Sequence, residues 1–99
     1  MVEKATQASI DAFLAGNAGW SHEKGTLVRV FEAPAFLAGL EFVGALAQKA
    51  EAADHHPDID IRWRKVTIRL VTHDAGNAIS GKDLSLAGEI QEIWKRYGA

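Results

Sequence analysis

Residues 59–70 contain two runs of alternating apolar and polar side chains that are out of step with each other. The apolar positions are odd-numbered in the first run and even-numbered in the second: Ile59, Ile61 and Trp63, then Val66, Ile68 and Leu70. One continuous strand could not keep both sets on one face, because successive side chains point to opposite faces of a sheet. A two-residue loop at Arg64 and Lys65 would remove the conflict, which predicts an antiparallel hairpin whose paired residue numbers sum to 129. This register places His73 opposite His56.

The remaining pattern predicts three helices and a second hairpin. A helix is expected over 5–15, two strands over 20–23 and 27–32 around Lys24-Gly25, a long helix over 34–53 with Pro34 in its first turn, and a last helix after Ser80. Ser80 and Asp83 have the spacing of a capping box. The predicted fold is therefore α+β, in the order α-β-β-α-β-β-α, with a four-stranded antiparallel sheet covered on one face by helices. We expect one domain over residues 1–99.

The long helix has more apolar surface than one sheet face requires. Its apolar residues form two stripes: Phe36, Leu40, Val43, Ala47 and Ala50, and Ala35, Ala38, Phe42, Ala45 and Leu46. The surplus predicts that a partner helix packs on it. That helix could be the first or last helix of the same chain, or it could belong to another molecule.

Composition excludes several classes of protein. The 99 residues contain no cysteine, which rules out disulfides and thiol chemistry and favours a reducing compartment. The formal charge of -2 argues against direct nucleic-acid binding, which needs a basic surface. No apolar run approaches the roughly 20 residues of a membrane span, and the first residues do not resemble a signal peptide. A cytoplasmic location is the expectation.

The stretch E-A-A-D-H-H-P-D, residues 51–58, concentrates the chemistry of the chain. Pro57 disfavours helical geometry at His56, so the long helix must end there and a strand must begin. The two histidines therefore lie at a helix-to-strand corner. If the hairpin brings His73 across from the neighbouring strand, three imidazoles form one cluster.

Three interpretations of this cluster remain open on spacing alone. Imidazoles titrate near neutral pH, so a close set can supply an acid and a base together. Three histidines and a carboxylate could instead bind zinc, although no H-x-x-x-H spacing is present. In the third interpretation, His55 and His56 only cap the end of the long helix. His22 is expected to be a surface residue, and Trp20 and Trp63 could belong to the core or stack on a flat ligand.

The ordered motif resembles that of the pterin-4a-carbinolamine dehydratases. The family pattern is an acidic residue, three spacers, H-H-P, five spacers, an aromatic residue, nine spacers, a histidine and then an aspartate. Here it is Glu51, His55-His56-Pro57, Trp63, His73 and Asp83. The segments V-T-H-D-A-G (71–76) and D-L-S-L-A (83–87) agree with it. The loop before Asp83 is one residue longer than is typical of the family, and Trp63 stands where tyrosine is commoner.

The resemblance implies a lyase that dehydrates 4a-hydroxytetrahydrobiopterin-type pterins to quinonoid dihydropterin and water, without a metal or an organic cofactor. It implies that His55, His56 and His73 are catalytic, with His56 or His73 as the acid and the other as the base. Asp83 would orient one imidazole, and Glu51, Pro57, Trp20 and Trp63 would bind the substrate. It also implies a homodimer or homotetramer formed through sheet edges and the long helix. The alternative is a non-catalytic interaction module with the same fold, which would bind a protein partner through that helix.

Overall fold

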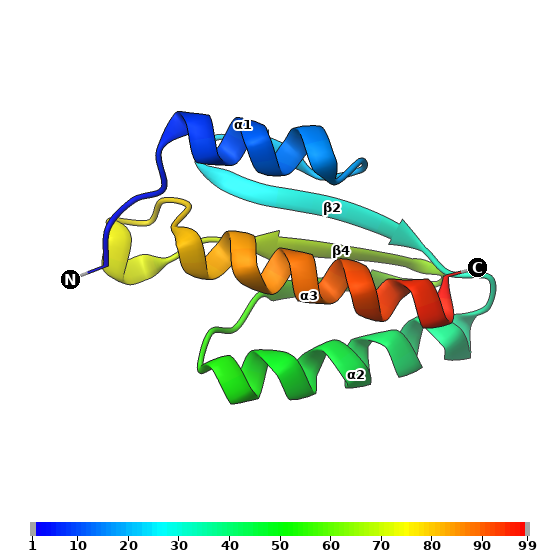
Figure 1. Ribbon diagram of the computed structural model, residues 1–99. Helices are drawn as coiled ribbons and strands as arrows, with labels where there is room; N and C mark the ends of the chain where they lie inside the picture. The colour runs from blue at the N-terminus through cyan, green and yellow to red at the C-terminus, as the bar shows by residue number, and fades with distance from the viewer. Residues whose placement is uncertain (1, 99) are drawn as a thin grey trace.

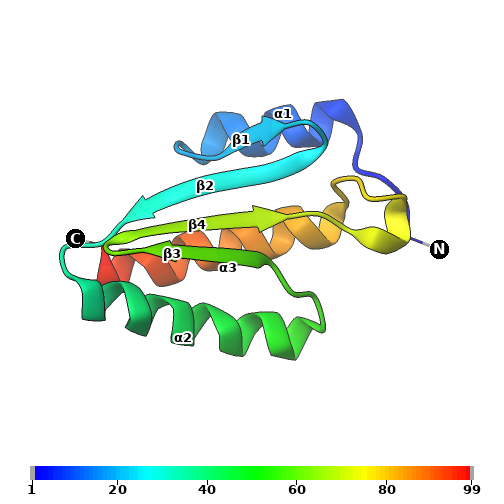
Figure 2. The same cartoon turned by 180° about the vertical axis from the view of Figure 1, so that it is seen from behind.

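The computed structural model describes residues 2–98 and confirms the predicted α+β fold. The elements, in chain order, are α1 (Gln7–Gly16), β1 (Ser21–Glu23), β2 (Thr26–Glu32), α2 (Phe36–Ala53), β3 (Asp58–Arg62), β4 (Lys65–Leu70), the 3-10 helix η1 (His73–Ala75) and α3 (Gly81–Tyr97). The antiparallel strands have the order β1-β2-β4-β3, so β1 and β3 are the edges. Figure 1 shows α1, α3 and α2 side by side in front of the sheet, and Figure 2 shows its open face.

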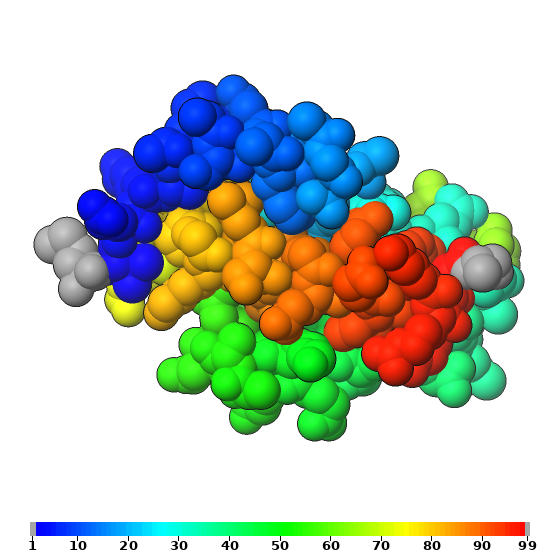
Figure 3. All heavy atoms as spheres, in the orientation of Figure 1, coloured from blue at the N-terminus to red at the C-terminus, as the bar shows by residue number. Residues whose placement is uncertain are grey.

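The core lies between the sheet and α3. Phe31 of β2, Phe42 of α2 and Trp94 of α3 form a triangle of aromatic rings with centroids 4.8–5.0 Å apart. Apolar residues of β4 and α3, including Ile68 and Ile90, are fully buried around them. The space-filling view shows the three helices forming one continuous surface over this core (Figure 3). Close packing of these rings and side chains fixes how α2 and α3 lie on the sheet.

Local signals explain where most helices begin and end. The Thr6 side chain accepts a hydrogen bond from the Ser9 backbone N–H, so α1 begins two residues later than its apolar pattern indicated. The predicted capping box of Ser80 and Asp83 starts α3. Helix α2 begins at Phe36, because Ala35 has an extended backbone, and Pro34 therefore precedes the helix rather than lying in its first turn.

The β3–β4 hairpin differs from its predicted register. Ile59 pairs with Ile68 and Ile61 with Val66, so paired numbers sum to 127 and the two-residue loop is Trp63-Arg64. Trp63 adopts a positive φ of 54°, a conformation that an aromatic residue rarely takes. The predicted pairing of His73 with His56 is therefore wrong. A shift of two preserves parity, so the apolar residues still share the face that was predicted.

Part of the surplus apolar surface of α2 is covered by α3, and part is not. Phe42, Leu46 and Ala50 are buried, whereas Leu37 at the outer surface of α2 is 69% exposed. Phe36 and Leu40 beside it, and Ile59 and Ile61 on the edge strand β3, are also exposed. No helix within residues 2–98 has the length and hydropathy needed to cross a bilayer.

Candidate active site

The corner between α2 and β3 presents two histidines from a short, fixed connection. Asp54 adopts left-handed geometry, with φ 50° and ψ 43°, and its N–H donates to carbonyls of the last helical turn. The backbone N–H of His55 donates to the Ala50 carbonyl at 3.1 Å. Backbone groups therefore end the helix, and the imidazoles are not needed as caps, contrary to the capping interpretation.

His73 reaches the same region from the other side of the sheet edge. Beyond β4 the chain continues to Thr72, whose N–H donates to the Ala78 carbonyl at 2.9 Å, and η1 then begins at His73. His55, His56 and His73 line one pocket of about 300 Å³, together with Asp54, Val71, Thr72, Asp74 and Lys82. The three imidazoles therefore meet as predicted, although a loop rather than a strand pairing brings them together.

Asp83 lies at the base of this pocket and is completely buried. Its Oδ1 lies 2.6 Å from His55 Nε2, while its Oδ2 accepts hydrogen bonds from the Ser80 backbone N–H at 2.8 Å and the Thr72 hydroxyl at 2.7 Å. A buried carboxylate is stable only if its oxygens are hydrogen-bonded in this way. The side chain of Asp83 thus caps α3 with one oxygen and contacts an imidazole with the other.

The hydroxyl groups around Asp83 have a single consistent proton arrangement. An ionised carboxylate only accepts, so Thr72 uses its hydroxyl proton on Asp83. The Ser80 hydroxyl, 2.6 Å away, must then donate to Thr72, while it accepts from the Lys82 backbone N–H. Asp83 Oδ1 consequently has His55 Nε2–H as its donor. This leaves Nδ1 of His55 as the nitrogen that can exchange a proton with a ligand.

The other two imidazoles also have one nitrogen engaged. His56 Nε2 lies 2.6 Å from Glu51 Oε1, and both side chains are more than half exposed. His73 Nδ1 lies 2.6 Å from Asn77 Oδ1. Each imidazole is therefore oriented by one oxygen acceptor and retains a second nitrogen, which is the arrangement that acid and base catalysis requires.

Comparison with known proteins decides the family. The family model described as pterin 4 alpha carbinolamine dehydratase matches residues 3–93. The chain belongs to this family. A relative from Mycobacterium sp. (strain KMS) is 53% identical over 92% of this chain and 96% of its own, and one from Roseiflexus castenholzii is 46% identical over 94% and 99%. Both carry the provisional name pterin-4-alpha-carbinolamine dehydratase.

Solved structures agree with the dehydratase-family fold. A protein from Brucella melitensis, titled transcriptional coactivator/pterin dehydratase, has a TM-score of 0.86 and 25% identity over 92% of this chain and 98% of its own. A pterin dehydratase-like protein, described as a RuBisCO assembly factor in the alpha-carboxysome, has a TM-score of 0.62 over 75% and 84% of the two chains. At 19% identity, the second likeness shows the fold alone.

The structure brings together only some of the residues that the family pattern assigns to the site. Asp83 and the three histidines meet at the pocket, and Glu51 contacts His56 at its rim. Pro57 ends the corner but does not line the pocket. Trp63 lies in the hairpin loop at the opposite end of β3 and is 73% exposed, while Trp20 is buried in the core and donates its Nε1–H to Gln91. Neither tryptophan reaches this pocket.

Sequence reasoning missed three residues of the dehydratase-family site: Thr72, Asn77 and Lys82. Each contacts a predicted residue or lines the same pocket. Thr72 could have been found as the neighbour of His73, but a lone threonine carries no functional signal. Within residues 2–98, no three His, Asp or Glu side chains are arranged to bind a metal ion.

Proposed function

We propose that this chain is a dehydratase that converts 4a-hydroxytetrahydropterins, of the tetrahydrobiopterin type, to quinonoid dihydropterin and water. Family membership and the relatives' names support this reaction class. The observation that carries the proposal is the pocket with three imidazoles, one of which is hydrogen-bonded to the buried Asp83. Its volume of about 300 Å³ lies at the small end of the range for small-molecule sites.

The reaction needs one proton delivered and one removed. The C4a hydroxyl must be protonated to leave as water, and the N5 proton must be taken as the C4a–N5 double bond forms. The N5 lone pair assists departure of the hydroxyl, so a positioned acid and base are sufficient in principle. Each histidine of the pocket can serve as either, because each retains a free ring nitrogen.

We assign His55 as the base. Its Nε2–H is held by Asp83, so the neutral imidazole has its lone pair on Nδ1, where it can accept the N5 proton. The imidazolium that forms is then paired with a buried carboxylate, which stabilises it more than an exposed one would. His56 and His73, from the other two sides of the pocket, supply the acid that protonates the leaving hydroxyl.

A direct assay on chemically generated 4a-hydroxytetrahydropterin tests this mechanism. His73→Ala should lower kcat by about 10²-fold or more, the usual contribution of a general acid or base. His22→Ala is the matched control, because His22 is an exposed histidine of β1 far along the chain from the pocket. Wild-type turnover in the His73 variant would contradict the three-histidine mechanism. Comparing His56→Ala with His73→Ala identifies the acid.

A second candidate function is an interaction module. The exposed apolar residues of α2 and β3 support it, and so do the printed roles of the two structural neighbours as coactivator and assembly factor. We propose that this surface first serves self-association, as a homodimer or homotetramer in the cytoplasm. Loss of self-association without loss of dehydration would separate the two functions.

A further inference from the structure

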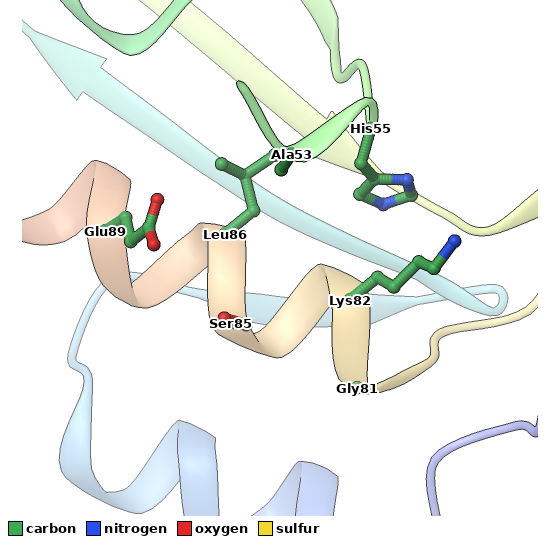
Figure 4. A pocket seen from close by; sticks show the side chains of 7 residues that line it. All are labelled: Ala53, His55, Gly81, Lys82, Ser85, Leu86 and Glu89. Carbon is green, nitrogen blue, oxygen red and sulfur yellow. The ribbon is translucent and has the colours of Figure 1, made fainter. Parts of the chain in front are cut away.

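A second cavity, of about 360 Å³, adjoins the three-histidine pocket. It lies between the end of α2 and the first turns of α3, and we call it the α2–α3 groove (Figure 4). Its own lining residues are Ala53, Gly81, Ser85, Leu86 and Glu89. His55 and Lys82 line both cavities, so the groove begins at the imidazole that we assign as the base. The proposed reaction leaves this space unused.

Three polar side chains of α3 border the groove without internal partners. Lys82, Ser85 and Glu89 have i, i+3, i+7 spacing and therefore lie along one face of the helix. Within residues 2–98, no ion pair or side-chain hydrogen bond joins any of the three to another group. Figure 4 shows Lys82 beside His55 and Glu89 at the other end, with Leu86 between them.

The geometry of a pterin relates this groove to the reaction. In a 4a-hydroxytetrahydropterin, N5 alone separates C4a from C6. If C4a and N5 lie at the histidines, a substituent on C6 begins next to the same imidazoles and must enter a space that borders them. The α2–α3 groove is such a space, because it shares His55 and Lys82 with the pocket.

We infer that the α2–α3 groove binds a polyhydroxylated side chain on C6 of the substrate, with Lys82, Ser85 and Glu89 as specificity-determining residues. This inference rests on the proposed function. Lys82 only donates hydrogen bonds, Glu89 only accepts them, and Ser85 does both. Neighbouring hydroxyl groups satisfy all three, an alkyl group satisfies none, and a phosphorylated tail would be repelled by the Glu89 carboxylate.

Binding of two unreactive ligands tests the groove independently of catalysis. One is a 7,8-dihydropterin with a methyl group at C6, and the other has a trihydroxypropyl group there. Calorimetry on the full chain should show the hydroxylated ligand binding about tenfold more tightly, the effect of one or two hydrogen bonds to charged groups. Glu89→Gln should reduce that ratio several-fold. Glu92→Gln removes the same charge one turn further along α3, where Glu92 pairs with Lys95, and should leave the ratio intact.

Two results would overturn the inference: equal affinities in the wild-type chain, or an equal loss of affinity for both ligands in Glu89→Gln. The dehydration assay distinguishes this failure from that of the proposed function. Turnover without any preference for the hydroxylated tail would reject the groove and keep the reaction. A tail preference in binding without turnover would reject the reaction and keep the groove as a site for pterin side chains.

Discussion

At the scale of single residues, Asp83 shows how one side chain supports both fold and chemistry. Its sequence position has two explanations, the N-terminal cap of a helix and the partner of an imidazole. In the structure the two explanations hold together, because Oδ2 accepts from the Ser80 backbone and Oδ1 contacts His55. The start of α3 and the orientation of His55 therefore depend on the same carboxylate.

Asp83→Asn should lower kcat by about 10³-fold, similar to the loss seen when a catalytic histidine takes the wrong tautomer. The Oδ2 position receives two donors, Thr72 O–H and Ser80 N–H, so the amide oxygen must occupy it. The amide NH₂ then faces His55 and forces the imidazole proton onto Nδ1, where the lone pair is needed. Steady-state kinetics measure the loss, and imidazole ¹⁵N chemical shifts report the tautomer.

Asp60→Asn is the control for this substitution, because Asp60 is an exposed carboxylate of β3 that pairs with Arg62. It should leave both the kinetics and the His55 tautomer unchanged. Unaltered ¹⁵N shifts in Asp83→Asn would show that Asp83 does not set the tautomer, even if stability and activity fell.

At the scale of elements, the sequence predicted the types and order of the helices and strands, but not the hairpin register. Alternation decides which face each side chain occupies, and a shift of two residues leaves every face unchanged. The loop alone could have distinguished a sum of 129 from one of 127. Trp63 occupies a left-handed position that asparagine or glycine normally fills, so its residue type gave no sign of the turn.

The turn between α1 and β1 gives a stability prediction at this scale. Gly19 has φ 97°, and a Cβ there would lie 2.8 Å from Nε of Arg29, whose guanidinium also packs 4.3 Å from the centroid of the Phe31 ring. Burial lowers the pKa of Arg29, which shows how closely its cation is enclosed. Gly19→Ala should therefore lower the free energy of unfolding by about 1–2 kcal/mol.

The matched substitution is Gly16→Ala at the last residue of α1, where an added Cβ meets nothing within 4 Å and φ is not positive. It should be neutral or stabilising by up to about 1 kcal/mol, because alanine favours helix and loses less entropy on folding. Urea unfolding of both variants measures the difference. Equal stabilities would mean that the turn tolerates a side chain at Gly19.

At the scale of the whole molecule, apolar pattern predicted the core better than the outer surface. The two stripes of α2 indicated surplus apolar area, and packing of α3 on Phe42 and Leu46 accounts for one part of it. The pattern could not show which stripe would remain exposed, because that depends on where α3 lies across the sheet. The site shows the same limit: the motif identified the histidines, whereas Thr72 and Lys82 joined them only through the fold.

The exposed remainder of α2 supplies the last prediction, that of self-association. Leu37 and its neighbours Phe36 and Leu40 adjoin the open edge strand β3, whose Ile59 and Ile61 are each more than one-third exposed. An apolar surface beside an unpaired strand edge is a typical interface between copies of a chain. Leu37→Glu should shift an oligomer toward monomer, since burial of one leucine contributes about 2 kcal/mol per copy and a buried unpaired carboxylate costs more.

Ala8→Glu adds the same charge at an exposed position of α1, on the other side of the helical layer, and should leave the oligomer intact. Light scattering coupled to size-exclusion chromatography gives the mass of each variant over a range of concentrations. A monomeric wild-type chain, or a Leu37 variant with the wild-type mass, would contradict the interface. Circular dichroism on the same samples shows whether a monomeric variant keeps its fold, as it should, because Leu37 contributes to no part of the core.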